Sequence, residues 1–336
     1  MSSTTHLGPT TIERGDLDGE PTWVLTNPAG ARLVVAERGA TALAWQVPDG
    51  AGRADLLDGY PTAAELTELD GYRGSVLAPW SNRIAGARYT FAGVSHDLGV
   101  AADGTREALH GLVTGLRWRR SPAADGVLRL TAVVPPDLNP GYPFSVTVTA
   151  AYSLGVGAAG ESRLGLEITA TNTGDGPAPV TLGWHPYLRM PGHDTIDDLE
   201  LTVPARARVL TDAHLIPLPG EQAYAGVSAP VRLRLAGLVL DQAFTDLVPD
   251  DDGVVTSVLR SPATGATLTL EQEPDQARVV HVFTGDPLVR RRRAAVAVEP
   301  CQTMADAFNR ADCADIVPVE PGQTRQLVTD IVYRRG

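Results

Sequence analysis

Short segments in which apolar and polar residues alternate dominate this sequence, and they restrict what it can fold into. Within 163–170, Leu164, Leu166, Ile168 and Ala170 share one face of an extended chain, and mostly polar residues share the other. A strand with one face on a hydrophobic core has this period of two. The same pattern predicts strands at 31–37, 128–134, 144–154, 199–203, 231–235, 266–271, 279–283, 294–298 and 327–333. The chain is therefore predicted to consist mainly of short β-strands.

Helix signals are few. Pro61 precedes the good helix formers of 62–69, where it suits the first turn of a helix, and 303–311 predicts one or two further turns. Because long amphipathic helices do not alternate with the strands, a parallel α/β sheet is not expected. We predict an all-β fold of large antiparallel sheets packed face to face. It should form one domain over residues 1–336, with residues 1 to about 10 disordered.

Composition excludes several classes of protein. The 336 residues include no lysine, so Schiff-base, pyridoxal-phosphate and Walker-type nucleotide chemistry is not expected. The net charge of −12 argues against a nucleic-acid partner, and the arginine run 290–293 is interpreted as a solvated loop. Cys301 and Cys313 match no zinc or redox spacing, so no metal is expected.

Targeting signals are also lacking. The N-terminal sequence does not have the charged and apolar regions of a signal peptide. No apolar run approaches the length of a membrane span. These observations predict a cytoplasmic protein with no membrane partner.

One motif resembles a dinucleotide-binding loop. The segment 155–160 has the spacing G-x-G-x-x-G, which binds a pyrophosphate only when a helix follows it. Here the alternating segment 163–170 follows instead, so a hairpin loop is predicted.

Two of the seven histidines stand out as candidates for catalysis. His110 is followed by Gly111, which permits a close backbone approach. His185 lies in Trp184-His185-Pro186-Tyr187, where Pro186 favours an extended backbone and aromatic residues flank the imidazole. Surface or packing roles are assigned to the other five histidines, namely His6, His96, His193, His214 and His281.

Charged residues at strand ends complete a candidate site. Glu299 follows the apolar segment 294–298, and Asp241 follows a similar short apolar run. Asn82 and Arg83 supply donors for sugar hydroxyls. Each residue alone also has a structural explanation, as a strand cap or a surface group.

In this order the residues resemble the aldose 1-epimerase family. The motifs are Asn82-Arg83-Ile84-Ala85-Gly86, Leu109-His110-Gly111, His185-Pro186-Tyr187, Asp241 and Glu299. The resemblance extends from about residue 31 to residue 333. It implies a β-supersandwich fold of the galactose mutarotase type, a small-molecule sugar as partner and no required cofactor. The oligomeric state is left open between monomer and homodimer.

The resemblance also implies a role for each residue. His185 would be the general acid at the ring oxygen of the sugar, and Glu299 the general base at the anomeric hydroxyl. His110 would orient the sugar near the ring oxygen, and Arg83 and Asp241 would bind other hydroxyls. Substrate contacts are also expected from Asn82, Trp184 and Tyr187, with Asp246 as an alternative to Asp241.

The sequence departs from some members of the family. Trp184 precedes the His-Pro-Tyr triplet, where some members have asparagine. The residues around the base, Glu299-Pro300 and Asp306-Ala-Phe-Asn309, resemble a bacterial branch of the family, to which the sulfoquinovose mutarotase is similar. A first alternative is therefore a mutarotase for a sulfonated or phosphorylated sugar, with Arg73, Arg83 and Arg189 as candidate ligands. A noncatalytic sugar-binding protein of the same fold is a second alternative. A third is a glycosidase with Asp241 and Glu299 as its paired carboxylates.

Overall fold

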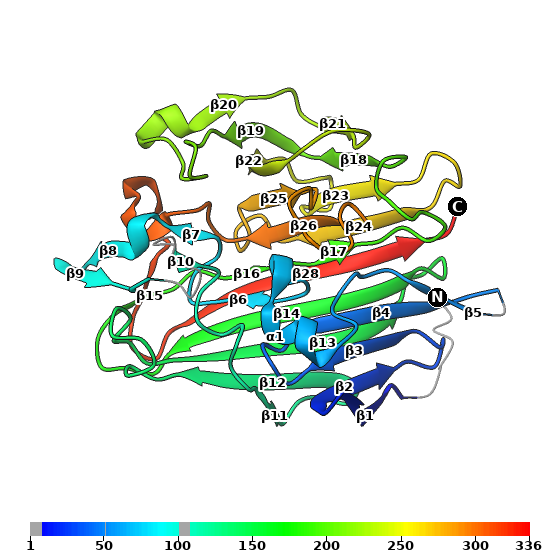
Figure 1. Cartoon of the computed structure of the whole chain (residues 1–336), viewed down its shortest axis with the longest axis horizontal. Coiled ribbons are helices and arrows are strands. Elements are labelled where there is room, and N and C mark those ends of the chain that lie inside the picture. The colour runs from blue at the N-terminus through cyan, green and yellow to red at the C-terminus, as the bar shows by residue number, and fades with distance from the viewer. Residues whose placement is uncertain (1–8, 51, 101–107) are drawn as a thin grey trace.

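Antiparallel sheets account for nearly all of the regular structure in a computed structural model that describes residues 9–50, 52–100 and 108–336 (Figure 1). The largest sheet has nine strands in the order β11-β12-β13-β14-β28-β24-β23-β18-β21. Their bounds are β11 (Arg119–Ser121), β12 (Val127–Val134), β13 (Val146–Val156), β14 (Ser162–Asn172), β28 (Thr324–Arg334), β24 (Thr267–Gln272), β23 (Val255–Arg260), β18 (Glu200–Val203) and β21 (Val231–Arg234). The predicted all-β fold is confirmed.

A second sheet of eight strands carries most of the residues discussed below. Seven strands follow the order β20-β19-β22-β25-β26-β16-β6, and β17 pairs with β26 beside this path. Their bounds are β20 (Tyr224–Gly226), β19 (Ala205–Val209), β22 (Asp241–Leu247), β25 (Val279–Phe283), β26 (Val296–Cys301), β16 (Gly183–Trp184), β6 (Val76–Leu77) and β17 (Tyr187–Leu188).

The remaining strands form a sheet of five and three pairs. The five are β1 (Thr11–Leu17), β2 (Glu20–Thr26), β3 (Arg32–Ala36), β4 (Ala42–Asp49) and β5 (Gly52–Asp55). The pairs are β7 (Arg83–Ile84) with β10 (Ala108–Leu109), β8 (Arg88–Phe91) with β9 (Val94–Asp97), and β15 (Ala178–Pro179) with β27 (Pro318–Val319).

Helical structure is as limited as the sequence predicts. The helix expected at 62–69 is α1 (Ala63–Glu68), where the Thr62 hydroxyl caps the first turn by accepting the backbone N–H of Glu65 at 3.2 Å. One of the turns expected within 303–311 is a 3₁₀ turn at Ala307–Asn309, and another 3₁₀ turn, Ala311–Cys313, begins where that segment ends. The others are Asp70–Tyr72, Ala85–Ala87 and Gly220–Ala223. No helix of the described residues is long and apolar enough to span a membrane.

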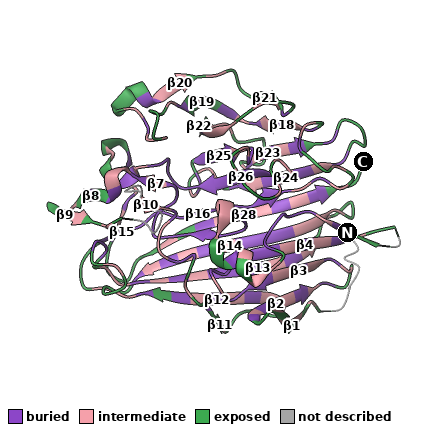
Figure 2. Ribbon diagram, viewed as in Figure 1, coloured by how far each residue is buried: buried purple, intermediate pink, exposed green. Residues whose placement is uncertain are grey.

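Alternation along the strands builds the core. Each segment predicted as a strand overlaps an observed strand, and buried and partly buried residues alternate along most strands (Figure 2). On β14 the apolar residues Leu164, Leu166, Ile168 and Ala170 are all buried, as predicted. The dinucleotide-like segment 155–160 lies at the hairpin between β13 and β14, which confirms the loop prediction.

The expected extent of the domain is not decided by these observations. Residues 1–8 of the terminus predicted to be disordered lie outside the described residues. One domain over residues 1–336 stays a prediction.

Two neighbouring strands of the eight-stranded sheet position the site, because each has one face on the core. Val280 and Val282 of β25, like Val296 and Val298 of β26, are fully buried in the main hydrophobic cluster. Successive side chains of a strand point to opposite faces. The residues between these valines, His281 on β25 and Ala297 on β26, therefore face away from that core.

Candidate active site

Ionisable side chains line a single cleft between the eight-stranded sheet and the loops over it. The cleft has a volume of about 190 Å³. Its ionisable and polar lining includes Asn82, Arg83, His110, His185, Asp241, His281 and Glu299. Six of the eight predicted site residues, all except Trp184 and Tyr187, therefore line this cleft. His281, which was not predicted, lines it as well.

Strand register fixes the carboxylates of the site. Glu299 on β26 lies directly opposite His281 on β25, and Asp241 on β22 lies opposite Phe283 two residues further along β25. Residues opposite one another on antiparallel strands point to the same face. The register therefore places the side chains of Asp241, His281 and Glu299 on one surface.

The central contact of the cleft joins His185 and Glu299. The imidazole Nε2 lies 3.3 Å from a carboxyl oxygen of Glu299, and both side chains are almost completely buried. Neither His185 Nδ1 nor the second Glu299 oxygen has a hydrogen-bond partner among the described residues. A buried polar atom without a partner is costly, and a bound polar ligand would supply one.

Burial controls the ionisation of this pair. Loss of solvent raises the pKa of Glu299 to about 8 and lowers the pKa of His185 to about 3. At pH values between these two, the pair holds one proton, as a carboxylic acid beside a neutral imidazole. The pair therefore titrates as a unit with one transferable proton.

A stack of three side chains holds His185 in place. Tyr187 lies parallel to its imidazole, with ring centroids 5.1 Å apart, and donates its hydroxyl to the carbonyl of Gly71 at 2.9 Å. Beneath it, the guanidinium carbon of Arg73 lies 4.8 Å from the Tyr187 ring centroid. Arg73 itself is ion-paired with Asp58.

His110 comes from a loop with an unusual backbone. Its φ is +61° and that of Asn82 is +57°, a region that non-glycine residues rarely occupy. The backbone N–H of Asn82 donates to His110 Nδ1 at 3.2 Å, which leaves the proton of the neutral ring on Nε2. Burial, with His185 and Arg83 nearby, lowers the pKa of His110 well below its usual value. This histidine is therefore a neutral hydrogen-bond donor.

Comparison with known proteins identifies the family. The sequence profile described as aldose 1-epimerase matches residues 21–331. The chain belongs to the aldose 1-epimerase family. Membership in this family implies an isomerase.

Relatives of the family differ in how much is known of them. The uncharacterized protein YihR of Escherichia coli (strain K12) is 28% identical over 263 residues, 78% of this chain and 79% of its own length. The aldose 1-epimerase of the same organism is 30% identical over 223 residues, 64% of this chain and 62% of its own. The GalM/aldose epimerase homologue from C. elegans superposes with a TM-score of 0.77 at 20% identity, covering 97% of this chain and 99% of that one. The predicted galactose mutarotase-like fold is confirmed.

The role assigned to His281 from the sequence does not agree with its position in the cleft. His281 was given a surface or packing role, but it lines the cleft and its Nε2 lies 2.7 Å from an Asp241 carboxyl oxygen. A signal was present in the sequence. Because Val280 and Val282 form the core face of this strand, His281 shares the opposite face with Phe283.

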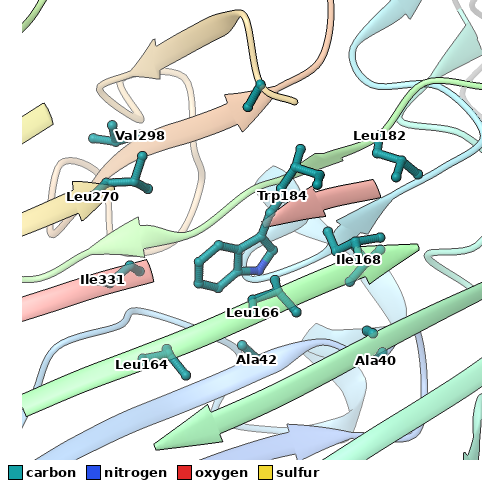
Figure 3. Packing of buried hydrophobic residues seen from close by; sticks show 14 of the residues in the cluster. Ala40, Ala42, Leu164, Leu166, Ile168, Leu182, Trp184, Leu270, Val298 and Ile331 are labelled. Carbon is teal, nitrogen blue, oxygen red and sulfur yellow. The ribbon is translucent and has the colours of Figure 1, made fainter. Parts of the chain in front are cut away.

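Trp184 requires a correction. Its side chain is fully buried in the main core, among Leu166, Ile168 and Leu182 (Figure 3), and its indole N–H donates to the carbonyl of Gly74 at 3.2 Å. It does not line the cleft. Trp184 follows the strand alternation that turns His185 to the cleft, so it points the other way into the core.

Two other expectations concern residues near the cleft. Tyr187 stacks behind His185 and does not line the cleft, so it supports the histidine. Of the two candidate aspartates, Asp241 lines the cleft, whereas Asp246 is exposed at the far end of the same strand.

The arginines fall into separate groups. Arg83 lines the cleft, Arg73 is buried in its ion pair with Asp58, and Arg189 lines a different cavity. The run 290–293 is a loop, as interpreted, in which Arg290 and Arg292 are exposed, whereas Arg291 and Arg293 are partly buried. Its ion pairs are Arg290 with Glu68, Arg291 with Asp58 and Glu65, Arg292 with Asp286, and Arg293 with Asp197 and Asp286.

Proposed function

We propose that this protein is a mutarotase that interconverts the α and β anomers of an aldose hexose. The observation that carries the proposal is the contact between His185 and Glu299 in a cleft also lined by His110, Arg83 and Asp241. Opening a cyclic hemiacetal requires one group that removes the proton of the anomeric hydroxyl and another that protonates the ring oxygen. A carboxyl and an imidazole in contact form such a pair.

The single proton held by His185 and Glu299 is sufficient for the complete reaction cycle. The proton resting on Glu299 crosses the 3.3 Å contact to His185, which gives a carboxylate and an imidazolium. Glu299 then takes the proton of O1 as His185 donates to O5, the C1–O5 bond breaks, and C1 becomes an aldehyde. Rotation about C1–C2 presents the other carbonyl face, and the reverse transfers close the ring with the opposite configuration.

Neighbouring residues bind and orient the sugar. The Nε2–H of His110 is a neutral donor for an oxygen near the ring, as its hydrogen bond from Asn82 leaves that nitrogen protonated. Arg83 and Asp241 offer a donor and an acceptor to the remaining hydroxyls, with Asn82 beside Arg83. We assign Tyr187 to the support of His185, and we propose no cofactor.

The distribution of arginines favours an uncharged aldose over a sulfonated or phosphorylated one. Of the three candidates for an anionic group, only Arg83 lines the cleft. Arg73 is committed to Asp58, and a sulfonate or phosphate usually requires several donors. A noncatalytic binding protein and a glycosidase remain as outcomes of the test below.

Polarimetry on freshly dissolved α-glucose and α-galactose tests the proposal. The wild type is expected to speed the approach to the equilibrium rotation, and Glu299→Gln and His185→Asn are each expected to lose about 10²–10⁴-fold in rate. Glu13→Gln and His214→Asn, the same changes at exposed positions, serve as controls. Wild-type activity that survives in Glu299→Gln would contradict the mechanism.

The alternatives give different results. Binding of sugar without any acceleration across a panel of aldoses, including sulfonated and phosphorylated hexoses, would indicate a binding protein. Acceleration only with the charged sugars would show that the uncharged substrate class is wrong. Release of a chromophore from an aryl glycoside would indicate a glycosidase.

A further inference from the structure

Three ionisable side chains share one face of the eight-stranded sheet at the floor of the cleft. His281 lies directly opposite Glu299 on β26 and directly opposite Ala243 on β22. Asp241 is two residues before Ala243, so it lies diagonally across from His281 on the same face. The imidazole is thus placed between the proposed base on one side and a second carboxylate on the other.

The contacts of His281 favour its protonated form. Its Nε2 lies 2.7 Å from the Asp241 carboxyl oxygen, and its side chain is only 12% exposed. Burial alone lowers the pKa of His281, but Glu299 and the hydrogen bond with Asp241 outweigh this effect, and the net pKa is raised. The same hydrogen bond, with the charge of His281, lowers the pKa of Asp241 against the effect of burial.

The other charged groups around His281 do not replace its effect on Glu299. Arg83 also lines the cleft and favours the carboxylate form of Glu299, whereas Asp241 disfavours it. His185 and His110 are neutral because burial lowers the pKa of each. Among the nearby charges, that of His281 most strongly opposes the effect of burial on the pKa of Glu299.

We propose that His281 is a positioning residue whose imidazolium, held between Asp241 and Glu299, opposes the effect of burial on Glu299 and so favours the carboxylate form in which Glu299 removes the anomeric proton. This inference rests on the proposed mutarotase function. It explains how a carboxyl group in so buried a position acts as a base. It also gives Asp241 a second task besides sugar binding, because Asp241 holds the imidazole and compensates its charge.

The substitution His281→Gln separates charge from shape. The glutamine amide retains an N–H for Asp241, but it carries no charge at any pH. Removal of an opposite charge a few ångströms from a carboxyl raises the pKa of that carboxyl by roughly one to three pH units. We expect the pH–rate profile of mutarotation to move to higher pH by a similar amount.

A purely structural role predicts a different result. If His281 only fills space and orients Asp241, the variant loses rate equally at every pH and its profile keeps the same midpoints. His214→Gln, the same change at an exposed histidine, is the matched control and should retain the wild-type profile. An unshifted profile in active His281→Gln would overturn the proposal.

A readout that does not use activity distinguishes this inference from the proposed function. The ionisation of Glu299 can be followed by the infrared band of its carboxylic acid, which is assigned from the difference between the spectra of the wild type and Glu299→Gln. In His281→Gln the midpoint of this titration should move to higher pH. If the wild type fails to accelerate mutarotation but this titration shifts, the proposed function fails and the electrostatic coupling stands. If mutarotation is present but the titration is unchanged, the coupling is wrong.

A second measurement covers the case in which His281→Gln does not fold. The coupling between two sites is reciprocal, so loss of the Glu299 charge must weaken the protonation of His281. NMR titration of the His281 ring should give a lower midpoint in Glu299→Gln than in the wild type. Equal midpoints in the two proteins would overturn the proposal without any variant at His281.

Discussion

Removal of the buried ion pair between Arg73 and Asp58 is predicted to destabilise the protein. Asp58→Asn keeps the shape of the side chain but removes the charge that faces Arg73. Both side chains are almost fully buried, with 1% of Arg73 and 4% of Asp58 exposed. Arg291 also donates to Asp58, at 2.9 Å. Two guanidinium groups therefore lose their shared carboxylate in one substitution.

The magnitude follows from what remains around Arg73. Its other terminal nitrogen still donates to the carbonyl of Arg290 at 2.9 Å, but no second carboxylate pairs with it among the described residues. Breaking a buried ion pair by removing one partner typically costs about 3–5 kcal/mol, because the remaining charge stays desolvated. Arg291 is less affected, since Glu65 retains it at 2.9 Å. We expect Asp58→Asn to lose free energy of unfolding near the lower end of this range.

Urea denaturation followed by far-UV circular dichroism measures the loss from the transition midpoint, provided the slope is unchanged. Asp97→Asn is the matched control, because Asp97 pairs with Arg88 at the surface, where the side chains are 45% and 67% exposed. That substitution should cost no more than about 1 kcal/mol. Equal, small losses in both variants would refute the view that Arg73 depends on Asp58 in a desolvated environment.

Further predictions concern the core, the His110 loop and the ionisation of the base. Trp184→Phe should lower the free energy of unfolding by about 1–3 kcal/mol in urea titrations, while the KM for sugar stays unchanged. The smaller ring leaves a void in the core, and the Gly74 carbonyl keeps only the N–H of Ala42 as a donor. Gly111→Ala should destabilise the loop and raise KM, measured by polarimetry at several sugar concentrations, because Gly111 has φ +80° and a Cβ there would lie 2.0 Å from the Ala78 oxygen. Burial raises the pKa of Glu299 from the ordinary 4.5 to about 8. The stability that the protonation of Glu299 contributes is therefore complete below pH 4.5 and is lost as the pH rises through 8. Glu299→Gln should remove that loss and be the more stable protein in thermal melts at pH 9, and a parallel pH dependence in both proteins would contradict it.

Strand alternation made most of the fold predictable from the sequence. Segments with one core face, such as 163–170 and 327–333, coincide with β14 and β28 because the hydrophobic pattern itself decides which face is buried. Strands β1 and β5 are among those that were not predicted. Their residues are largely exposed or polar, and pairing with neighbouring strands rather than burial defines them.

The site was only partly predictable, for reasons that lie in the pairing of strands. The family motifs indicate Glu299 and His185, but nothing local to residue 281 shows that it lies opposite residue 299. Trp184 illustrates the converse. It is adjacent to a cleft residue in the sequence, yet strand alternation turns its side chain into the core. The role of Arg73 likewise depends on Asp58, a contact that no spacing in the sequence reveals.

The residues of the cleft are positioned in two different ways. His281 and Glu299 lie on strands whose opposite faces carry buried valines, and Asp241 lies on β22, which pairs with β25, so the register of the sheet fixes their separation. Asn82 and His110 lie on loops with positive φ values, and such conformations persist only where the surroundings enforce them. A strand position accepts many residues as long as alternation is kept, whereas a position with positive φ restricts which residue can occupy it. Accordingly, Gly86 and Gly111, which also have positive φ, lie in the same short motifs as Asn82 and His110, while Asp241, His281 and Glu299 are fixed by strand pairing.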